Sequence, residues 1–403
     1  MPGPVRQLTL AQARAHVQRR CFTAPGTDAA DLLGLETEWH VLPDGDPAGP
    51  VPFARLQGAM AVAEPLSGGS RVTYEPGGQL ELSGPPAASV GDACRRMAAD
   101  VGAARRAVRL AGLELLAEGA DPWRAPHRVV HTPRYAAMER FFDTDGTEGR
   151  RMMSSTAALQ VNVGLGEDTM VGGRWLLAHA IGPTLVAAFA NSPVAAGRST
   201  GWKSSRFATW WTIDPSRTAP VGAGGGLAAW AAYAMAARVM FIRARPDEYR
   251  PLARPMPFAR WLVEGHELGH PTVDDLDYHL TTLFPPVRPR GWLELRYLDA
   301  LPDPWWRVAA TVVAALVCDD EASAAAFRAT EGTEDLWLDA ARYGLQHPAL
   351  GASAKECVGA ALDAAGRIGA DAASVDATAE YYDRYVVQGR CPADDRLLEA
   401  ARA

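Results

Sequence analysis

Acidic and amide side chains alternate with apolar ones in four short segments of this chain. The segments are Gly34–Trp39, Gln79–Ser83, Leu159–Val163 and Trp292–Tyr297. Because residues i and i+2 of a β-strand share a face, each segment predicts a strand with one apolar and one polar face. Neighbouring strands of this kind would gather at least four carboxylates. Close carboxylates must be exposed, protonated or neutralised by cations, and divalent metal ions carrying a phosphate substrate meet that requirement.

Two pairs of glutamates supply the first candidate metal ligands. Glu36 and Glu38 form a Glu-x-Glu pair, and such oxygen ligands suit Mg²⁺. For this pair alone, a strand with its charged side in water is the alternative. Glu75 and Glu81 flank a Pro-Gly-Gly turn, which lets them approach one site from different directions. The alternative there is an ordinary turn that leads into an edge strand.

Amide and ion-pair residues occupy the other two polar faces. Gln160 and Asn162 can complete a metal shell or bind the polar groups of an amino acid, and a structural cross-strand network fits equally well. Glu294 and Arg296 share a face of the last strand. They form either a plain salt bridge or a site for a metal ion and a transferred phosphoryl group.

A Gly/Arg/Ser loop at residues 197–206 precedes Trp210 and Trp211. Arginine is the natural two-pronged partner of carboxylates and phosphates. The arginines of this loop are therefore candidate substrate contacts, with ordinary solvation at the surface as the alternative.

Other motifs carry less weight. Residues 266–270 spell His-Glu-Leu-Gly-His, the zinc-hydrolase pattern, but two glycines and a following proline oppose the helix that this chemistry requires. We interpret the motif as a chance match and keep a zinc hydrolase as a distant alternative. The lone His279 is interpreted as structural. The glycine-rich stretch 222–226 matches no phosphate-binding pattern and is interpreted as a hinge.

Composition limits the classes of function. The 403 residues include 40 basic and 47 acidic side chains, so the excess positive charge of a general nucleic-acid binder is missing. The first 21 residues hold no apolar stretch of signal-peptide length, and the longest apolar run, 226–242, is interrupted by Arg238. Five scattered cysteines without a CxxC pair predict neither a disulfide framework nor a zinc knuckle. We expect a cytoplasmic protein without a membrane partner.

Strands and helices that position these residues follow one another irregularly. We expect strands at about 33–41, 71–83, 155–164 and 291–298, and helices at about 9–20, 92–118, 175–190 (kinked at Pro183), 227–243 and through an Ala-rich tail from about 305 to 403. The absence of a repeating βαβ rhythm predicts an α+β fold with an antiparallel sheet. No long linker interrupts the chain, so a single domain over residues 1–403 with a helical C-terminal region is predicted.

Taken together and in order, several segments resemble the second, plant-type group of glutamate–cysteine ligases, and most of all the actinobacterial ligases of ergothioneine biosynthesis. The matching segments are Gly34–Trp39, Tyr74–Ser83, Met152–Met153 with Gln160–Asn162, Asn191–Pro193, and His279–Arg288 with Leu293–Arg296. They spread over about two-thirds of the chain. The resemblance implies a glutamine-synthetase-like fold, in which ATP and the substrates lie over a curved antiparallel sheet.

The resemblance also implies the reaction. The γ-carboxylate of L-glutamate is joined to the amino group of L-cysteine, after ATP has converted that carboxylate to an acyl phosphate. Charge neutralisation and in-line positioning matter more for this chemistry than a protein base does. A ligase of the same fold with another amine acceptor, and a non-catalytic nucleotide-binding relative, remain the alternatives.

Residue roles follow from the resemblance by motif. The implied Mg²⁺ ligands are Glu36, Glu38, Glu75, Glu81 and Glu294. Arg296 resembles the contact to the transferred phosphoryl group and, with Arg206 and Glu294, completes the implied catalytic set. Gln160 or Asn162 stands where some relatives have a histidine metal ligand. The residues implied to contact the nucleotide are Gln160, Asn162, Arg288 and Arg296. The implied substrate contacts are Arg206, Arg198, Thr156 and Met153. The disulfide-based redox control of plant relatives does not transfer, because the cysteine positions do not match.

Overall fold

The computed structural model describes residues 7–23, 31–252 and 254–402, and its centre is an antiparallel sheet of seven strands. The strands follow the order β10-β11-β5-β1-β3-β2, and β4 also pairs with β1. Their bounds are β1 Leu33–Pro43, β2 Arg71–Tyr74, β3 Leu80–Ser83, β4 Leu113–Leu116, β5 Ala158–Gly164, β10 Val287–Pro289 and β11 Trp292–Asp299. Two small hairpins join β6 (Val194–Ala195) to β7 (Arg198–Ser199) and β8 (Ile242–Arg245) to β9 (Glu248–Arg250). The predicted α+β class is confirmed.

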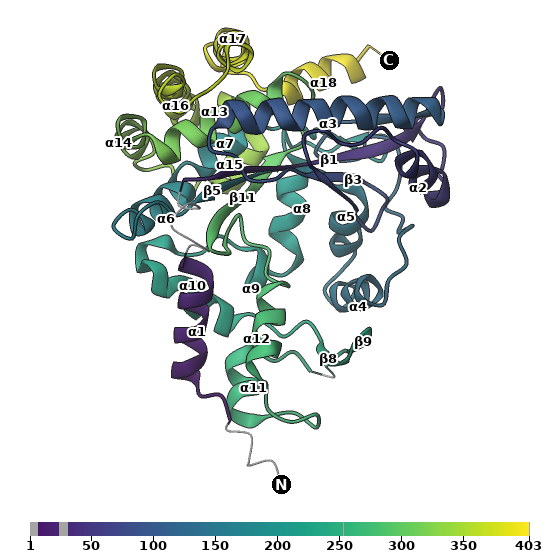
Figure 1. Ribbon diagram of the computed structural model, residues 1–403, viewed down its shortest axis with the longest axis vertical. Helices are drawn as coiled ribbons and strands as arrows, with labels where there is room; N and C mark the ends of the chain where they lie inside the picture. The colour runs from purple at the N-terminus through teal and green to yellow at the C-terminus, as the bar shows by residue number, and fades with distance from the viewer. Residues whose placement is uncertain (1–6, 24–30, 253, 403) are drawn as a thin grey trace.

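Helices cover both faces of the sheet (Figure 1). Above the sheet in that view lie α3 Val90–Leu110, α7 Gly182–Ala188, α13 Trp305–Cys318, α14 Asp320–Ala329, α15 Trp337–Tyr343, α16 Pro348–Ala364, α17 Ala372–Tyr381 and α18 Pro392–Ala400. Below it lie α1 Leu10–Phe22, α4 Pro133–Phe142, α5 Glu148–Ser155, α8 Ser205–Ile213, α9 Pro215–Thr218, α10 Leu227–Ala236, α11 Phe258–Glu264 and α12 Val273–Leu280. The remaining elements are α2 Phe53–Ala61, α6 Val171–Ala180, and the short helical turns η2 Ala223–Gly225, η3 Gly344–Gln346 and η4 Tyr382–Val386.

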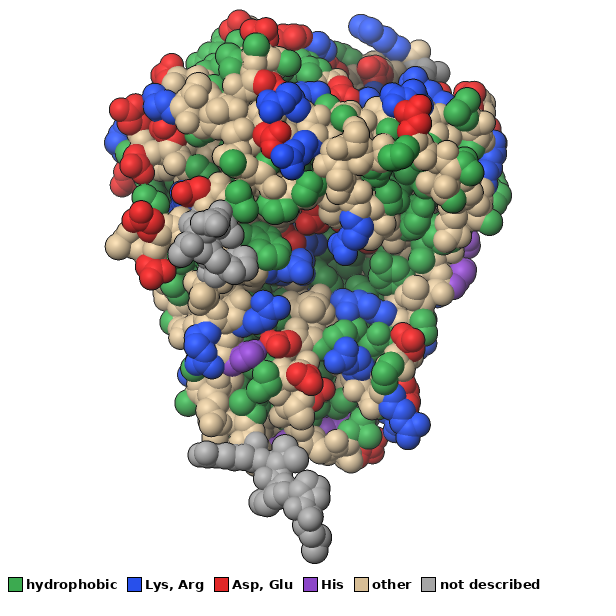
Figure 2. Space-filling view, viewed as in Figure 1, with side chains coloured by type: hydrophobic (Ala, Val, Ile, Leu, Met, Phe, Trp, Pro, Cys, Tyr) green, Lys and Arg blue, Asp and Glu red, His purple; other side chains and the backbone are tan. Residues whose placement is uncertain are grey.

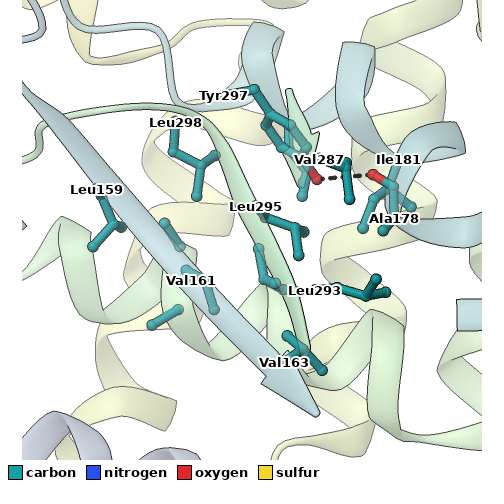
Figure 3. Close-up of a cluster of buried hydrophobic side chains, with 14 of the residues drawn as sticks. Leu159, Val161, Val163, Ala178, Ile181, Val287, Leu293, Leu295, Tyr297 and Leu298 are labelled. Carbon is teal, nitrogen blue, oxygen red and sulfur yellow. Dashed lines mark hydrogen bonds between the residues drawn. The ribbon is translucent and has the colours of Figure 1, made fainter. Parts of the chain in front are cut away.

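One face of the sheet is the apolar core face that the alternating sequence predicts. Leu159 and Val161 of β5 and Leu293 and Leu295 of β11 are all buried side by side (Figure 3). The neighbouring Tyr297 hydroxyl donates to the Ala178 carbonyl at 3.3 Å, which ties β11 to α6. Each fully buried aliphatic side chain of this kind contributes about 1.5–3 kcal/mol to stability. This packing fixes the register, because a shift by one residue would bury the polar side chains instead.

The pairing register of β1, β3, β5 and β11 places their polar side chains together on the opposite face of the sheet. Glu36 pairs across the strands with Gln160, and Glu38 pairs with Glu81. Asn162 pairs with Glu294. Four strands thus contribute acidic or amide side chains to one surface, as the i, i+2 spacing predicts.

Two expected helices are shorter than predicted. The helix predicted over 92–118 ends at Leu110, because Gly112 adopts φ +66° and the chain returns as β4. The helix predicted over 227–243 ends at Ala236, and its last residues enter β8 instead. The kink expected at Pro183 is confirmed as a break between α6 and α7, and the helical tail is confirmed.

Candidate active site

A cavity of about 410 Å³, here called the carboxylate cavity, opens on the polar face of the sheet. Of the predicted site residues it is lined by Glu36, Glu38, Glu75, Glu81, Met153, Thr156, Gln160, Arg206, Arg288, Glu294 and Arg296. Asn162 lies beside it and contacts Glu36. Arg198 does not join the group, because it is exposed on β7 and lines a separate cavity of about 770 Å³. Figure 2 shows a hollow near the middle of the viewed face in which acidic and basic side chains meet.

The Pro-Gly-Gly turn places Glu75 in this cavity. A Cβ at Gly77 would lie 2.2 Å from the Ser154 carbonyl oxygen, so the turn can approach the end of α5 only with glycine at that position. Gly78 adopts φ +84°, and the Pro76 carbonyl accepts hydrogen bonds from the backbone of residues 129 and 130. The turn is therefore held from two sides.

Hydrogen bonds orient three of the carboxylates. Glu38 accepts from the Ala158 N–H at 2.8 Å and from Gln160 Nε2 at 3.1 Å. Glu36 accepts from Asn162 Nδ2 at 3.1 Å. Glu81 accepts from Thr73 Oγ1 at 2.6 Å. The two amides therefore act here as donors to the carboxylates, within a cross-strand network.

Burial disfavours the charged form of several of these carboxylates. It raises the pKa of Glu36 to about 7, with further repulsion from Glu294 and Glu81. Burial also raises the pKa of Glu38, against the attraction of Arg206. The pKa of Glu75 lies well above its ordinary value because of burial and then the negative charges of Glu38 and Glu81. The group thus needs either protons or a bound cation.

Glu294 differs, because arginines already balance its charge. It is fully buried and accepts from Arg288 Nε at 2.6 Å, Arg296 Nη1 at 2.9 Å and Arg290 Nη1 at 3.2 Å. Burial alone would raise the pKa of Glu294, but the positive charges of Arg288 and Arg296 outweigh it and hold that pKa below its ordinary range.

A hard divalent cation fits the donor chemistry of this cavity. Glu36, Glu38, Glu75 and Glu81 offer the oxygen ligands that Mg²⁺ prefers, and the raised pKa values show that positive charge is in short supply around Glu36, Glu38 and Glu75. Within the described residues, however, no group of three or more His, Cys, Asp or Glu side chains is arranged tightly enough to hold a metal ion. The glutamates therefore suit Mg²⁺ in the type of their ligand atoms and in their shared location. Their side chains would have to move closer together to enclose an ion.

Two arginines face the carboxylates. Arg296 Nη1 donates to Gln160 Oε1 at 2.5 Å as well as to Glu294. Arg206 is buried, and its Nη2 donates to the Arg296 carbonyl at 2.7 Å, whereas its Nε has no hydrogen-bond partner. Both guanidinium carbons lie 5.9 Å from the centre of the Trp210 ring. This pair presents positive charge beside the carboxylates.

Asp299, which sequence reasoning missed, anchors the segment before Arg206. Its carboxylate accepts from the Asn191 N–H at 2.8 Å, from Ser192 Oγ at 2.8 Å and from Ser204 Oγ at 2.9 Å, and it lies 3.9 Å from Arg206 Nη1. The sequence did hold a signal for this residue. Asp299 ends β11 on the face that otherwise carries the apolar residues Leu293 and Leu295.

The last helix braces the same segment from outside. Lys203 Nζ forms an ion pair with Asp394 of α18, and the Ala393 N–H donates to the Ala190 carbonyl at 2.9 Å. The loop that leads into α8 is thus held between Asp299 and the C-terminal helix.

The histidine motifs play no part in this cavity. Residues 266–270 form a tight turn, in which the His266 N–H donates to the Gly269 carbonyl at 3.0 Å and the Gly269 N–H donates to the His266 carbonyl at 2.8 Å. The two histidines therefore do not share a helix face, and the chance-match interpretation is confirmed. His279 is buried, bonds the Ala234 carbonyl through Nε2 at 2.9 Å and stacks on Phe258, which confirms its structural role.

Comparison with known proteins decides the family. The model of glutamate–cysteine ligase family 2 (GCS2) matches residues 32–402. The chain belongs to this family. It is 42% identical over 375 residues to "Glutamate--cysteine ligase EgtA" of Mycobacterium tuberculosis (strain H37Rv), covering 90% of this chain and 84% of that protein. It is 40% identical over 399 residues to the protein of the same name from Mycolicibacterium smegmatis, covering 97% and 92% of the two chains.

Plant relatives match a smaller part of the ligase. A chloroplastic glutamate–cysteine ligase of Arabidopsis thaliana is 30% identical over 254 residues, which cover 60% of this chain and 48% of that protein. The resemblance predicted from the motifs is confirmed, and the protein is an enzyme of the ligase class. Across the parts of the chain that the structure describes, no helix combines the length and apolarity needed to cross a bilayer.

Proposed function

We propose that this ligase joins the γ-carboxylate of L-glutamate to the amino group of L-cysteine at the expense of ATP, giving γ-glutamylcysteine, ADP and phosphate. Family membership supports the reaction class. The observation that carries the proposal is the carboxylate cavity, in which Glu36, Glu38, Glu75 and Glu81 lie together with Arg206 and Arg296. Phosphoryl transfer to a carboxylate depends on this kind of charge neutralisation and positioning.

Glu36, Glu38, Glu75 and Glu81 would hold Mg²⁺ in this proposal. Bound there, the metal would neutralise phosphate charge and orient the nucleotide. For Glu294 we propose that its main task is to fix Arg288 and Arg296, since guanidinium groups occupy both of its oxygen atoms. Gln160 and Asn162 donate hydrogen bonds to Glu38 and Glu36. We propose that the two amides contribute to nucleotide binding by orienting these carboxylates.

Substrate glutamate would lie against Arg206, with Thr156 and Met153 as walls of its pocket. A carboxylate oxygen of glutamate attacks the γ-phosphorus of ATP, and ADP leaves. The amine of cysteine then attacks the carbonyl carbon, phosphate leaves, and the amine proton is released. Arg296, whose Nη1 is held by Glu294 and Gln160, would stabilise the transferred phosphoryl group through its guanidinium charge. Such a sequence needs no protein nucleophile.

A coupled assay of ADP release tests the proposal. Glutamate and ATP are held constant while candidate amines are varied, and turnover is expected with cysteine. Strong turnover with another amine and none with cysteine would identify a ligase with a different acceptor. Nucleotide binding by calorimetry without ADP formation from any amine would instead show a non-catalytic relative.

Two finer features belong to the same proposal. The antiparallel sheet with its cavity on the polar face supports a glutamine-synthetase-like fold. The similarity to the EgtA proteins supports a product destined for ergothioneine or a related thiol. Mass analysis of thiols in cells that lack the gene would test the second point.

A further inference from the structure

The cavity of about 770 Å³, here called the hairpin cavity, shares the helices α5 and α8 with the carboxylate cavity but none of its lining residues. Its other walls come from α15, the β6–β7 hairpin and the segment that follows this hairpin. Figure 1 places α5 and α8 next to each other below the sheet. On α8, Arg206 and Trp210 line the carboxylate cavity, whereas Ser205 and Thr209 line the hairpin cavity. A single helix therefore presents side chains to both cavities.

We propose that the hairpin cavity is an effector site for an aromatic α-amino acid, and that an occupied site favours glutamate binding in the carboxylate cavity. The inference rests on the proposed function and adds a regulatory site to it. It also gives a role to Arg198, which lines the hairpin cavity and not the carboxylate cavity. The volume of the hairpin cavity lies within the range of about 300–1,000 Å³ that is typical of pockets for one small ligand.

Side chains of both charges line the hairpin cavity and suit a zwitterion. Arg198 is exposed, and its guanidinium forms no hydrogen bond or ion pair with any residue that the structure describes. Arg151 Nη1 lies 3.3 Å from Glu148 Oε2, and the other oxygen of Glu148 accepts no hydrogen bond from the described part of the chain. Arginine is the natural partner of a carboxylate, and a carboxylate oxygen accepts from an ammonium group. The lining thus offers both partners that an α-amino acid requires.

Aromatic rings and a buried hydroxyl complete the lining. Trp202 and Trp211 contribute two half-buried indole rings, and aromatic rings pack favourably against one another in offset-stacked or edge-to-face arrangements. Ser205 is only 6% exposed, and its hydroxyl has no hydrogen-bond partner among the residues described. Because buried hydroxyl groups are normally paired, a polar group of a ligand would supply the partner that Ser205 lacks. An aromatic amino acid therefore matches this lining better than a purely polar molecule does.

The β6–β7 hairpin is a preformed wall of this cavity. Its turn has Ala196 at φ +49° and Gly197 at φ +75°. The Ala196 N–H donates to the Asp121 carbonyl at 3.0 Å, and the Gly197 N–H donates to the Pro122 carbonyl at 2.6 Å. An alanine in the left-handed region persists only where its surroundings hold it there, so these hydrogen bonds fix the position of the hairpin.

A ligand held between the hairpin and α8 would stabilise the arrangement in which Arg206 lines the carboxylate cavity. Ser205 directly precedes Arg206, and the Arg206 N–H donates to Ser192 Oγ at 3.1 Å. A ligand shifts a conformational equilibrium toward the state that it binds. Because the hairpin cavity exists in the state that places Arg206 in the carboxylate cavity, its occupant and substrate glutamate should each raise the affinity of the other.

Calorimetric titration with L-tryptophan and with L-phenylalanine tests the site on two variants and a matched control. Arg198→Glu reverses the charge of the free guanidinium, and Ala195→Trp fills the cavity from β6. Arg245→Glu makes the same charge change on the other small hairpin, at an exposed position that does not line the cavity. We expect the dissociation constant to rise at least about tenfold in both cavity variants and to stay within about twofold in Arg245→Glu.

Steady-state kinetics test the effector role. With the bound amino acid at saturation, the KM for glutamate should fall at least about twofold in the unmodified protein and stay unchanged in Ala195→Trp. Absence of binding by either amino acid, or binding that survives in both cavity variants, would overturn the site. Binding with an unchanged or raised KM for glutamate would overturn its effector role. Binding by an unmodified protein that fails to ligate cysteine would support the site and overturn the proposed function.

Discussion

Glu36 and Glu294 share a cavity but differ in how their charge is balanced. Replacing Glu36 by Gln keeps the volume and a hydrogen-bond acceptor for Asn162, so the fold should persist while metal binding and ligation are lost. Activity below about 1% with an unchanged melting temperature is the expected result. Near-normal turnover at ordinary Mg²⁺ concentration would contradict the proposed metal-ligand role of Glu36.

Glu294→Gln should remove activity and also destabilise the protein. The substitution leaves Arg288 buried without a counter-charge, and breaking a buried ion pair costs about 3–5 kcal/mol. Chemical denaturation should therefore show a clearly lower free energy of unfolding than for Glu36→Gln. Equal stability of the two variants would mean that the arginines are not held by Glu294.

Arg296→Lys tests whether this position requires a guanidinium group rather than a positive charge alone. Arg296 Nη1 contacts both Gln160 and Glu294, and lysine offers one compact ammonium in place of a planar fork. We expect kcat to fall by at least about 100-fold, since lost charge stabilisation in phosphoryl transfer is of that order. A fall of less than about threefold would mark the pair as a structural salt bridge.

Spacing along strands predicted which residues share the site, but not how each acts. Glu36, Glu38 and Glu81 reach one cavity because the side-chain period of a strand is fixed. Arg206 and Arg198 lie in one Gly/Arg/Ser loop, and only the start of α8 and the β6–β7 hairpin, which depend on distant contacts, send Arg206 inward and Arg198 outward.

At the scale of elements, the turn that carries Glu75 is the most constrained. Gly77→Ala would place a Cβ against the Ser154 carbonyl, which must move, so we expect a loss of about 1–3 kcal/mol in stability and reduced activity. Gly172→Ala in α6 is the matched control, because a Cβ there meets open space. Thermal melts of both variants measure the difference in stability. Equal melting temperatures would contradict the claim that the turn requires glycine at position 77.

Element boundaries were less predictable than element types. Leu113–Leu116 carries a pattern that suits helix or strand, and its pairing with β1 decides in favour of β4. Gly112, with φ +66°, ends α3, yet a glycine within an Ala/Arg-rich run gives no such signal on its own. Tertiary pairing therefore overrode local propensity after the end of α3.

Across the whole molecule, buried neutral histidines couple stability to pH. Burial lowers the pKa of His40 and of His179 to about 4, and burial with repulsion from Arg217 lowers that of His279 to about 3. These values lie below the usual 6.5, so the unfolded chain binds more protons and stability falls as the pH drops from about 6.5 toward 4.

His279→Gln should weaken that pH dependence. Between pH 7 and pH 5 the variant should lose about 2 kcal/mol less stability than the unmodified protein, because one pKa unit corresponds to about 1.4 kcal/mol. Urea unfolding at the two pH values measures the difference. Parallel losses in both proteins would show that His279 takes up a proton in the folded state.

All five cysteines are free thiols within the folded protein. Burial raises the pKa of Cys21 and Cys318 to about 11 and that of Cys94 and Cys357 to about 12, and it also raises that of Cys391. Thiolate is the reactive form, so alkylation of the native protein at pH 7.5 should be slow and ligase activity indifferent to mild oxidants or reductants. Rapid labelling seen by mass spectrometry before denaturation would contradict this.

The brace between α18 and the loop before α8 has a consequence for biosynthesis. Strands β1 to β11 are all translated before Asp394 emerges to meet Lys203. A ribosome-bound chain would therefore form its central sheet early, whereas Arg206 would reach its final position only late. A premature stop codon just ahead of Cys391 should thus yield a protein that accumulates in soluble form but has low ligase activity.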